Sequence, residues 1–312
     1  MEGILLAHKP INITSAHFLN LLKKKLNLPR STKVGHGGTL DKFASGLLVV
    51  GIGRRFTKEL HQTLTSADKE YQAIIELGKE SSTDDPEGEI TVTSKPLPTL
   101  SAIQKVVLSL PLNQPFPQTA PVYSAKKYLG RRLSDLARLL ILKKSFQRSQ
   151  ERQNKNYDKC PPPPSKLVTI FNIRMDDYSP PLLRLRLTVS SGFYVRAFAR
   201  DLGQTFHCGA YLKELTRVRI SGYLLTDALS LPDLDDNITL SIRLEGDVQG
   251  IGFRAFLHQQ MEKLNLSGSA ANLPDGSVSL SASGPLPQLI KLSETALAFP
   301  PHLTNYYLLW KK

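Results

Sequence analysis

Apolar residues recur at two different spacings along the chain, and each spacing predicts its own kind of element. Spacings of three and four positions predict helices over residues 17–28, 101–110, 253–266 and 287–298. Ser15 stands where a side chain would cap the first of these helices. Alternation and short apolar runs predict strands over residues 3–8, 47–50, 71–77, 167–175, 182–189, 239–248 and 304–310. This mixture indicates an α+β protein.

The order of these elements divides the chain into two domains. Residues 239–312 contain a strand, a helix, two strands around residues 272–276, a helix and a strand, an order typical of a ferredoxin-like βαββαβ sandwich. We therefore expect a C-terminal domain over residues 239–312 with a core of its own. Residues 232–238 are predicted to be a short acidic linker, and residues 1–231 the first domain.

The charge of the chain is strongly positive and unevenly spread. The formal net charge is +13, which points to a polyanionic partner and to nucleic acid first. Residues 126–166 hold twelve Lys or Arg against three Asp or Glu, so this segment contributes nine of the thirteen charges. Residues 239–312 are nearly neutral, with six against five. Within the basic segment, residues 146–164 are polar and end in four prolines, which predicts a solvated insertion.

The remaining bulk features exclude several classes of protein. Two cysteines are too few for a disulfide framework or a zinc site. The N-terminus lacks a basic, cleavable leader, and no apolar run reaches the roughly 18 residues that span a bilayer. We expect a cytoplasmic protein that uses no metal, organic cofactor or membrane, and no obligate protein partner is evident.

A glycine-rich segment, GHGGTLDKFASGLL, places the carboxylate Asp41 within a basic protein. Gly37, Gly38 and Gly46 allow a positive φ or a close approach of the backbone to a ligand. This pattern fits an aspartate presented on a rigid loop. On the spacing alone, it fits better an Asp41 that caps a turn or a short helix beginning at Lys42.

The same segment resembles the catalytic motif of the TruB family of tRNA pseudouridine synthases. Other family motifs are matched in order by HKP at 8–10, KEYQAIIELG at 69–78, PVYSAKKYLGRRLSDLAR at 121–138, SSGFYVRAFARDLG at 190–203 and LTRVRISGY at 215–223. The resemblance covers about residues 3–231. It implies a catalytic domain with the mixed sheet of the pseudouridine synthases. The family's thumb and the basic insertion would together occupy about residues 121–166.

The resemblance also implies roles for three residues. A stacked uridine must be flipped into a pocket before its glycosidic bond can be rearranged. Asp41 would be the nucleophile, attacking either C6 of the uracil or C1′ of the ribose. Arg196 would pair with Asp41 and hold its pKa low. Tyr71 would stack on the base and help to remove the C5 proton, although packing is the commoner role of a strand tyrosine.

Further residues match family positions that contact RNA. His36 would contact the T-loop, or would be an ordinary turn histidine. Lys9 and Tyr194 would support the RNA-binding pocket. The alternative for Lys9 is that its side chain packs on the protein and places its charge at the surface. Phosphates of the RNA would be neutralised by four cations of the thumb, Lys126, Lys127, Arg131 and Arg132. A solvated helix face is the alternative for these four. Arg217 and Arg219 would hold phosphates or complete salt bridges at a strand edge.

The sequence departs from the family pattern at three positions that flank the predicted pocket. Gly37 stands where Thr is usual, Lys42 where Pro is usual, and Phe193 where a small hydroxyl residue is common. These changes would alter the rate of the reaction without abolishing it.

The C-terminal region carries a second resemblance. LEGDVQGIGFR at 244–254 is similar to the acylphosphatase motif GxVQGxGFR, and NLPDG at 272–276 is similar to the N-x-x-DG that follows it. Backbone N–H groups at a helix N-terminus would bind a phosphate, within the loop Gln249, Gly250, Ile251, Gly252, Phe253 and Arg254. Arg254 would add a charge-assisted contact, and Asn272 would orient the attacking water. GSAAN at 268–272 lacks the bulky residue and the arginine usual before this Asn.

Together the two resemblances imply that the chain converts a uridine in the T-loop of tRNA, at position 55, to pseudouridine. They also imply that the C-terminal domain hydrolyses a small acyl phosphate. The alternative is a module that binds or folds tRNA with weak catalysis or none. The C-terminal domain would then be a structural replacement for the RNA-binding PUA domain that commonly ends this family.

Overall fold

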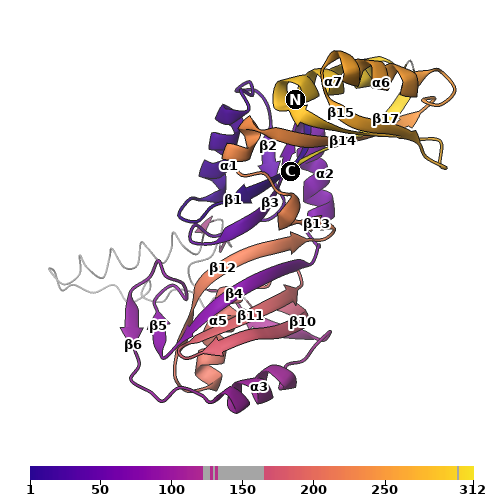
Figure 1. Cartoon of the computed structure of the whole chain (residues 1–312). Coiled ribbons are helices and arrows are strands. Elements are labelled where there is room, and N and C mark those ends of the chain that lie inside the picture. Colours follow the sequence, from indigo (N-terminus) through magenta and orange to yellow (C-terminus); the bar gives the residue numbers. More distant parts are fainter. Residues whose placement is uncertain (122–126, 129–130, 133–164, 301) are drawn as a thin grey trace. The chain divides into compact units, whose positions relative to one another are not determined.

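The computed structural model describes residues 1–121, 127–128, 131–132, 165–300 and 302–312. Contacts between these residues divide the chain into two compact units (Figure 1). Unit 1 consists of Met1–Lys69 and Thr216–Lys312, and unit 2 is Glu70–Leu215. Both contain helices and strands, as the hydrophobic pattern predicts.

The N-terminal part of unit 1 is a set of short strands and two helices. In chain order its elements are β1 (Gly3–Lys9), α1 (Ser15–Lys25), β2 (Val34–His36), β3 (Ser45–Ile52) and α2 (Arg54–Leu64). Strand β1 pairs antiparallel with β3 along its whole length, and β2 pairs with the other edge of β3. Every residue of β3 after Ser45 is buried, because the strand is central in its sheet and covered on both faces.

The residue that caps helix α1 lies one position before the predicted cap. Thr14 is the N-cap, and its hydroxyl accepts a hydrogen bond from the N–H of His17. Ser15, the predicted cap, is the first helical residue and is buried. Its hydroxyl contacts another part of the chain, as shown below.

The C-terminal part of unit 1 has the predicted ferredoxin-like order. Its elements are β14 (Asn237–Gly246), α6 (Phe253–Lys263), β15 (Ser267–Asn272), β16 (Val278–Pro285), α7 (Leu286–Ala298) and β17 (Leu303–Lys311). The strands are antiparallel in the order β15-β16-β14-β17. Both helices lie on the same face of this sheet (Figure 1). The predicted βαββαβ sandwich is confirmed.

This sandwich shares its sheet and its core with the N-terminal part of unit 1. Strand β17 pairs in parallel with β1, with Ile4 opposite Leu309 and Leu5 opposite Trp310. The indole Nε1 of Trp310, which is fully buried, donates to the backbone oxygen of Glu2 at 2.9 Å. One apolar cluster contains residues of both parts. The pairing of β17 with β1 makes the sheet continuous, and the apolar cluster extends across both parts.

Unit 2 is built around a second group of strands. They run in the order β12-β4-β11-β10-β7, which are Ala210–Ile220, Lys69–Leu77, Leu182–Val189, Ser165–Ser179 and Pro115–Thr119. Strand β12 begins in unit 2 and ends in unit 1. Among its described residues, unit 2 has the helices α3 (Leu100–Ser109) and α5 (Val195–Thr205). A separate hairpin is formed by β5 (Lys79–Ser81) and β6 (Ile90–Val92).

Short elements complete the described chain. They are the paired strands β8 (Lys127–Tyr128) and β9 (Arg131–Arg132), the strand β13 (Tyr223–Leu224), and the 3₁₀ turns η1 (Leu225–Asp227) and η2 (Pro232–Asp235). The turn η2 falls within the predicted linker. The predicted bounds at 231 and 239 thus separate the regions of the two sequence resemblances, and the two compact units have other bounds. The assignment of residues 1–231 and 239–312 as domains stays a prediction. None of the helices described combines the length and apolar character needed to cross a bilayer.

Candidate active sites

Asp41 lies in the loop between β2 and β3, and no helix begins within this loop. The N–H of Ala44 donates to the backbone oxygen of Asp41 at 3.2 Å, so residues 41–44 form a turn. The helix considered at Lys42 is therefore absent. Gly46 has φ +113°, and a Cβ there would lie 2.3 Å from the backbone oxygen of Arg217 on the neighbouring strand. A side chain at this position would push β3 and β12 apart.

Three side chains of unit 1 hold the backbone on either side of Asp41. The hydroxyl of Ser15 donates to the oxygen of Leu40 and accepts from its N–H, at 2.9 and 3.0 Å. The ammonium of Lys9 donates to three carbonyls, Pro10 at 2.8 Å, Ile13 at 2.7 Å and Lys42 at 3.4 Å. Because Lys9 is fully buried, it is not a surface cation.

Arg217 is the third of these side chains and is also fully buried. Its Nε donates to the oxygen of Leu47 at 2.9 Å, and its Nη2 to that of Gly38 at the same distance. It therefore fastens the glycine loop to the strand that follows it. Arg219 instead forms a salt bridge with Asp68, 2.7 Å between Nη2 and Oδ2, as one of the two readings of its motif predicted.

His36 is the last residue of β2, where the same loop begins, and its ring can accept a hydrogen bond. Burial lowers the pKa of His36, and the nearby charge of Arg217 lowers it further. The imidazole is therefore neutral at pH 7. Within the described part of the chain, its Nδ1 is buried and has no hydrogen-bond partner. Next to it, a Cβ at Gly37 would lie 2.3 Å from Cδ1 of Leu64, so the glycine leaves room for α2.

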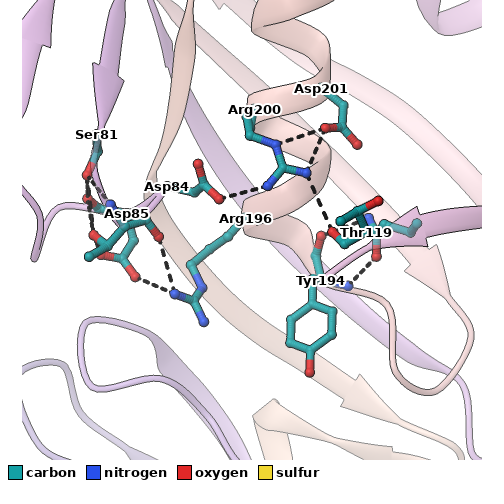
Figure 2. A network of polar contacts seen from close by, with 10 residues as sticks. Ser81, Asp84, Asp85, Thr119, Tyr194, Arg196, Arg200 and Asp201 are labelled. Carbon is teal, nitrogen blue, oxygen red and sulfur yellow. Dashed lines mark hydrogen bonds and ion pairs between the residues drawn. The ribbon is translucent and has the colours of Figure 1, made fainter. Parts of the chain in front are cut away.

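Tyr71 and Arg196 belong to unit 2. Tyr71 is buried in β4, and Arg196 is the second residue of α5 and only 5% exposed. Nη1 of Arg196 donates to Oδ2 of Asp85 at 2.9 Å and to the oxygen of Thr83 at 3.3 Å (Figure 2). Asp85 is equally buried. The predicted partner of Arg196, Asp41, belongs to the other unit, and their pairing stays a prediction.

Asp85, in the turn TDDPEGE at 83–89, is a member of this site that the sequence motifs did not indicate. Its Oδ1 accepts from the hydroxyl of Thr83 at 2.5 Å and from the N–H of Glu87 at 3.0 Å. These bonds fix the turn between β5 and β6 and point the second carboxylate oxygen at Arg196. The excess of acids in TDDPEGE over what a turn needs was the signal for this role.

A second arginine of α5 holds the same turn. Arg200 forms an ion pair with Asp84, 3.1 Å between Nη1 and Oδ2, and another with Asp201 at 2.9 Å (Figure 2). Burial raises the pKa of the Asp84 carboxyl, while the charge of Arg200 opposes that rise. The turn and the helix are therefore tied by two arginine–aspartate pairs one helical turn apart.

The predicted thumb residues are partly outside the described structure. Lys126 lies outside it, as does the insertion at 146–164. Lys127 pairs with Arg132, and Tyr128 with Arg131, in the backbone of the β8-β9 hairpin. Tyr194 is the N-cap residue of α5.

The second candidate site lies in unit 1, where β14 leads into α6. Gly250 and Gly252 both have positive φ, +78° and +74°, and a Cβ at either position would meet nothing within 4 Å. This backbone is therefore open in front of the N-terminus of α6. Arg254 and Asn272 are both exposed.

Gln249 ties this loop to the turn that follows Asn272. Its Nε2 donates to the oxygens of Leu273 and Ser277, at 3.0 Å each. The hydrogen bonds of Ser277 lower the pKa of Asp275, which closes the turn. The side chain of Gln249 is thus hydrogen-bonded within the protein. In the predicted phosphate site, Gln249 would contribute its backbone N–H.

No cluster of three or more His, Cys, Asp or Glu suited to a metal ion occurs among the residues that the structure describes.

Comparison with known proteins identifies the first of the two sequence families. The model of the TruB family pseudouridylate synthase N-terminal domain matches residues 23–195. A tRNA pseudouridine synthase B of Dehalococcoides mccartyi is 34% identical over 80% of this chain and 74% of its own length. The chain belongs to the TruB family. A second relative with the same description, from Chlamydia abortus, is 35% identical over 75% of this chain and 91% of its own length.

The other comparisons agree with the fold. A chain from the crystal structure of a Cbf5-Nop10-Gar1 complex superposes with a TM-score of 0.51 at 24% identity, over 74% of this chain and 53% of that one. This chain thus spans about half the length of that neighbour, and the likeness shows a shared fold. The acylphosphatase family model matches residues 240–304. The C-terminal region of this TruB family member is therefore acylphosphatase-like.

Proposed function

We propose that this TruB family member converts uridine 55 in the T-loop of tRNA to pseudouridine, with Asp41 as the nucleophile. The observation that carries the proposal is the support of the Asp41 loop. Ser15 bonds the residue before Asp41, Lys9 bonds the residue after it, and Arg217 fastens the loop to β3. A nucleophile fixed in this way needs little reorganisation before attack.

The reaction is an isomerisation, so its balance needs no co-reactant. The N1–C1′ bond of the uridine breaks, the base turns while it stays bound, and a bond forms between C5 and C1′. The proton on C5 is lost to a base and N1 gains one. Asp41 forms a transient bond to C6 or C1′ and is released unchanged. Tyr71 and Arg196 keep their predicted roles in this proposal, stacking on the base and keeping the carboxylate ionised.

His36 supports the choice of RNA as substrate. Its neutral ring has a buried Nδ1 that accepts no bond from the described protein, which suits a hydroxyl or amino group of a nucleotide. Of the sequence departures, Gly37 and Phe193 are buried and Lys42 is exposed, and we expect all three to change the rate only.

The test measures tritium release from a tRNA transcript labelled at C5 of its uridines. Asp41→Asn should abolish release, while Asp236→Asn, at an exposed position of the same unit, should release tritium like the wild type. A transcript with cytidine at position 55 should release none. Wild-type turnover by Asp41→Asn would disprove the nucleophile, and release from the cytidine transcript would disprove the position.

A second candidate function is hydrolysis of an acyl phosphate by the C-terminal region. The open backbone at Gly250 and Gly252, at the start of α6, favours it. Water held by Asn272 would attack phosphorus, and the acyl carboxylate would leave from Arg254's side of the phosphate. The products are inorganic phosphate and a carboxylic acid.

Benzoyl phosphate is a suitable probe for this activity. Wild-type protein should hydrolyse it, and Arg254→Ala should lose the activity, whereas Lys263→Ala, at an exposed position of the same helix, should keep it. No hydrolysis by the wild type would leave the C-terminal region with the structural role of the alternative hypothesis.

A further inference from the structure

Gln118 is a buried amide at the end of β7 that the predicted chemistry does not use. It is 3% exposed, and it is the one residue of its strand that is buried. Burying a carboxamide costs free energy unless its polar atoms are paired. The partners of this side chain therefore show what its burial achieves.

Both polar ends of Gln118 bond the backbone of a single residue. Its Nε2 donates to the oxygen of Tyr194 at 3.0 Å, and its Oε1 accepts from the N–H of Tyr194 at 2.8 Å. The side chain thus pairs with Tyr194 as a neighbouring strand would. It holds the two peptide groups on either side of the Tyr194 Cα.

Tyr194 is the residue from which α5 begins. As the N-cap it sets where the helix starts, and its oxygen also accepts the first bond of the helix, from Phe198 at 3.1 Å. Arg196 follows two positions later. Displacing Tyr194 would rotate or shift the first turn, and Arg196 would move with it.

Two neighbours of Gln118 in β7 contact the same region. The ring of Phe116 packs edge-on against Phe193, with centroids 6.4 Å apart. The oxygen of Thr119 accepts from Nη2 of Arg200 at 3.5 Å (Figure 2). Strand β7 therefore contacts α5 and the turn before it at three points, of which the Gln118 pair is the shortest.

We propose that Gln118 is a positioning residue for the synthase reaction, which acts by fixing Tyr194 and, through the first turn of α5, Arg196. The inference rests on the proposed synthase function. It requires no contact between Gln118 and the substrate.

The test replaces Gln118 with Leu, which keeps the volume and removes both bonds. Single-turnover pseudouridine formation at saturating enzyme should fall by about 10- to 100-fold, since small displacements at a site have effects of that size. The Kd for tRNA should stay within about twofold, because both polar atoms of the buried amide are bonded to the backbone of Tyr194. Gln104→Leu, the same change at an exposed position of α3, should leave both quantities unchanged.

The route through Arg196 is tested by a double substitution. Arg196→Lys shortens the group that is to be positioned, so adding Gln118→Leu to it should lower the rate by less than about threefold. Full additivity would overturn the route. An unchanged rate in Gln118→Leu, or a rate loss matched by weaker tRNA binding or by unfolding in circular dichroism, would overturn the positioning role. A wild type that forms no pseudouridine would overturn the proposed function and, with it, this inference.

Discussion

The arginines of the two candidate sites are held in opposite ways. Arg196 is buried, ion-paired with a buried Asp85, and carried by a helix whose first residue is itself clamped. Arg254 is exposed beside a loop with open space in front of two glycines. In the first arrangement, burial and ion pairing hold the arginine in one geometry. The second leaves the arginine side chain in contact with solvent.

This difference predicts unequal effects on folding. A buried charge that loses its partner is expensive, while an exposed one is solvated by water. Substitutions around Arg196 should therefore change stability and turnover together. Substitutions of Arg254 should lower the turnover of acyl phosphate and leave stability unchanged.

The largest effect is expected for Asp85→Asn. It keeps the oxygen that accepts from Thr83 and Glu87, and it replaces the charged oxygen that accepts from Arg196 with an NH2 group, which cannot accept that bond. Breaking a buried pair should cost roughly 3 kcal/mol of unfolding free energy and most of the pseudouridine formation. Urea unfolding of the variant checks the first expectation and tritium release the second.

Asp201→Asn is the matched control. Its carboxylate pairs with Arg200 but is 49% exposed, so the loss should stay below about 1 kcal/mol. Equal losses in the two variants would show that burial is not what distinguishes the Asp85 pair.

Glu76 sharpens the comparison because here the carboxylate is buried and its two cations are exposed. Lys213 and Lys79 lie 2.8 and 2.6 Å from its oxygens, and with the hydroxyl of Tyr211 they lower the pKa of Glu76 to about 2, against the rise that burial alone would cause. The folded pKa is below the unfolded one. The stabilisation is therefore present above about pH 4.5 and is lost as the pH falls toward 2.

The shift corresponds to at most about 3 kcal/mol. Unfolding free energies measured between pH 6 and pH 2.5 should fall more steeply for the wild type than for Glu76→Gln. Parallel curves for the two proteins would contradict this assignment.

An intermediate case is Arg55, which is half-buried where β17 meets the N-terminal part of unit 1. It donates to the side-chain oxygen of Asn305 and to the oxygen of Tyr306, and lies 4.3 Å from the centre of the Tyr306 ring. Arg55→Ala should cost about 1 to 2 kcal/mol, from the lost ring contact and hydrogen bonds. Arg54→Ala, the exposed neighbour on α2, should stay within about 0.5 kcal/mol in the same thermal unfolding assay.

The smallest effect on folding is expected for Arg254→Ala. Because its side chain is exposed, the unfolding free energy should change by less than about 0.5 kcal/mol. A loss above 1 kcal/mol in the same urea experiment would mean that Arg254 is part of the fold, and the contrast with Arg196 would fail.

The shared apolar cluster of unit 1 also decides which experiments can separate the two proposed activities. Removing residues 232–312 would take β17 from the edge of β1 and expose the apolar cluster that both parts bury. Such a truncation would disturb the Asp41 loop, since β1 and β3 frame it. Point substitutions such as Asp41→Asn and Arg254→Ala test one site at a time.

Much of the fold followed from local pattern, and the failures have physical causes. The ferredoxin-like order could be read from spacing because each helix and strand there buries one face. Helix α2 was missed although Phe56, Leu60 and Leu64 follow at intervals of four. Strand β12 was not predicted as a strand, because its polar residues such as Arg217 are paired by distant parts of the chain.

The sequence by itself determined the family, the order of the elements and which residues carry the predicted chemistry, since these depend on residue type and spacing. Only the tertiary structure decided what holds those residues. It placed Lys9 and Arg217 inside the protein, assigned Asp85 to Arg196, joined β17 to β1, and gave Gln118 a partner 76 positions away. Such pairings arise from contacts between distant segments, where the cost of burying a polar group decides its partner, and local pattern carries no record of them.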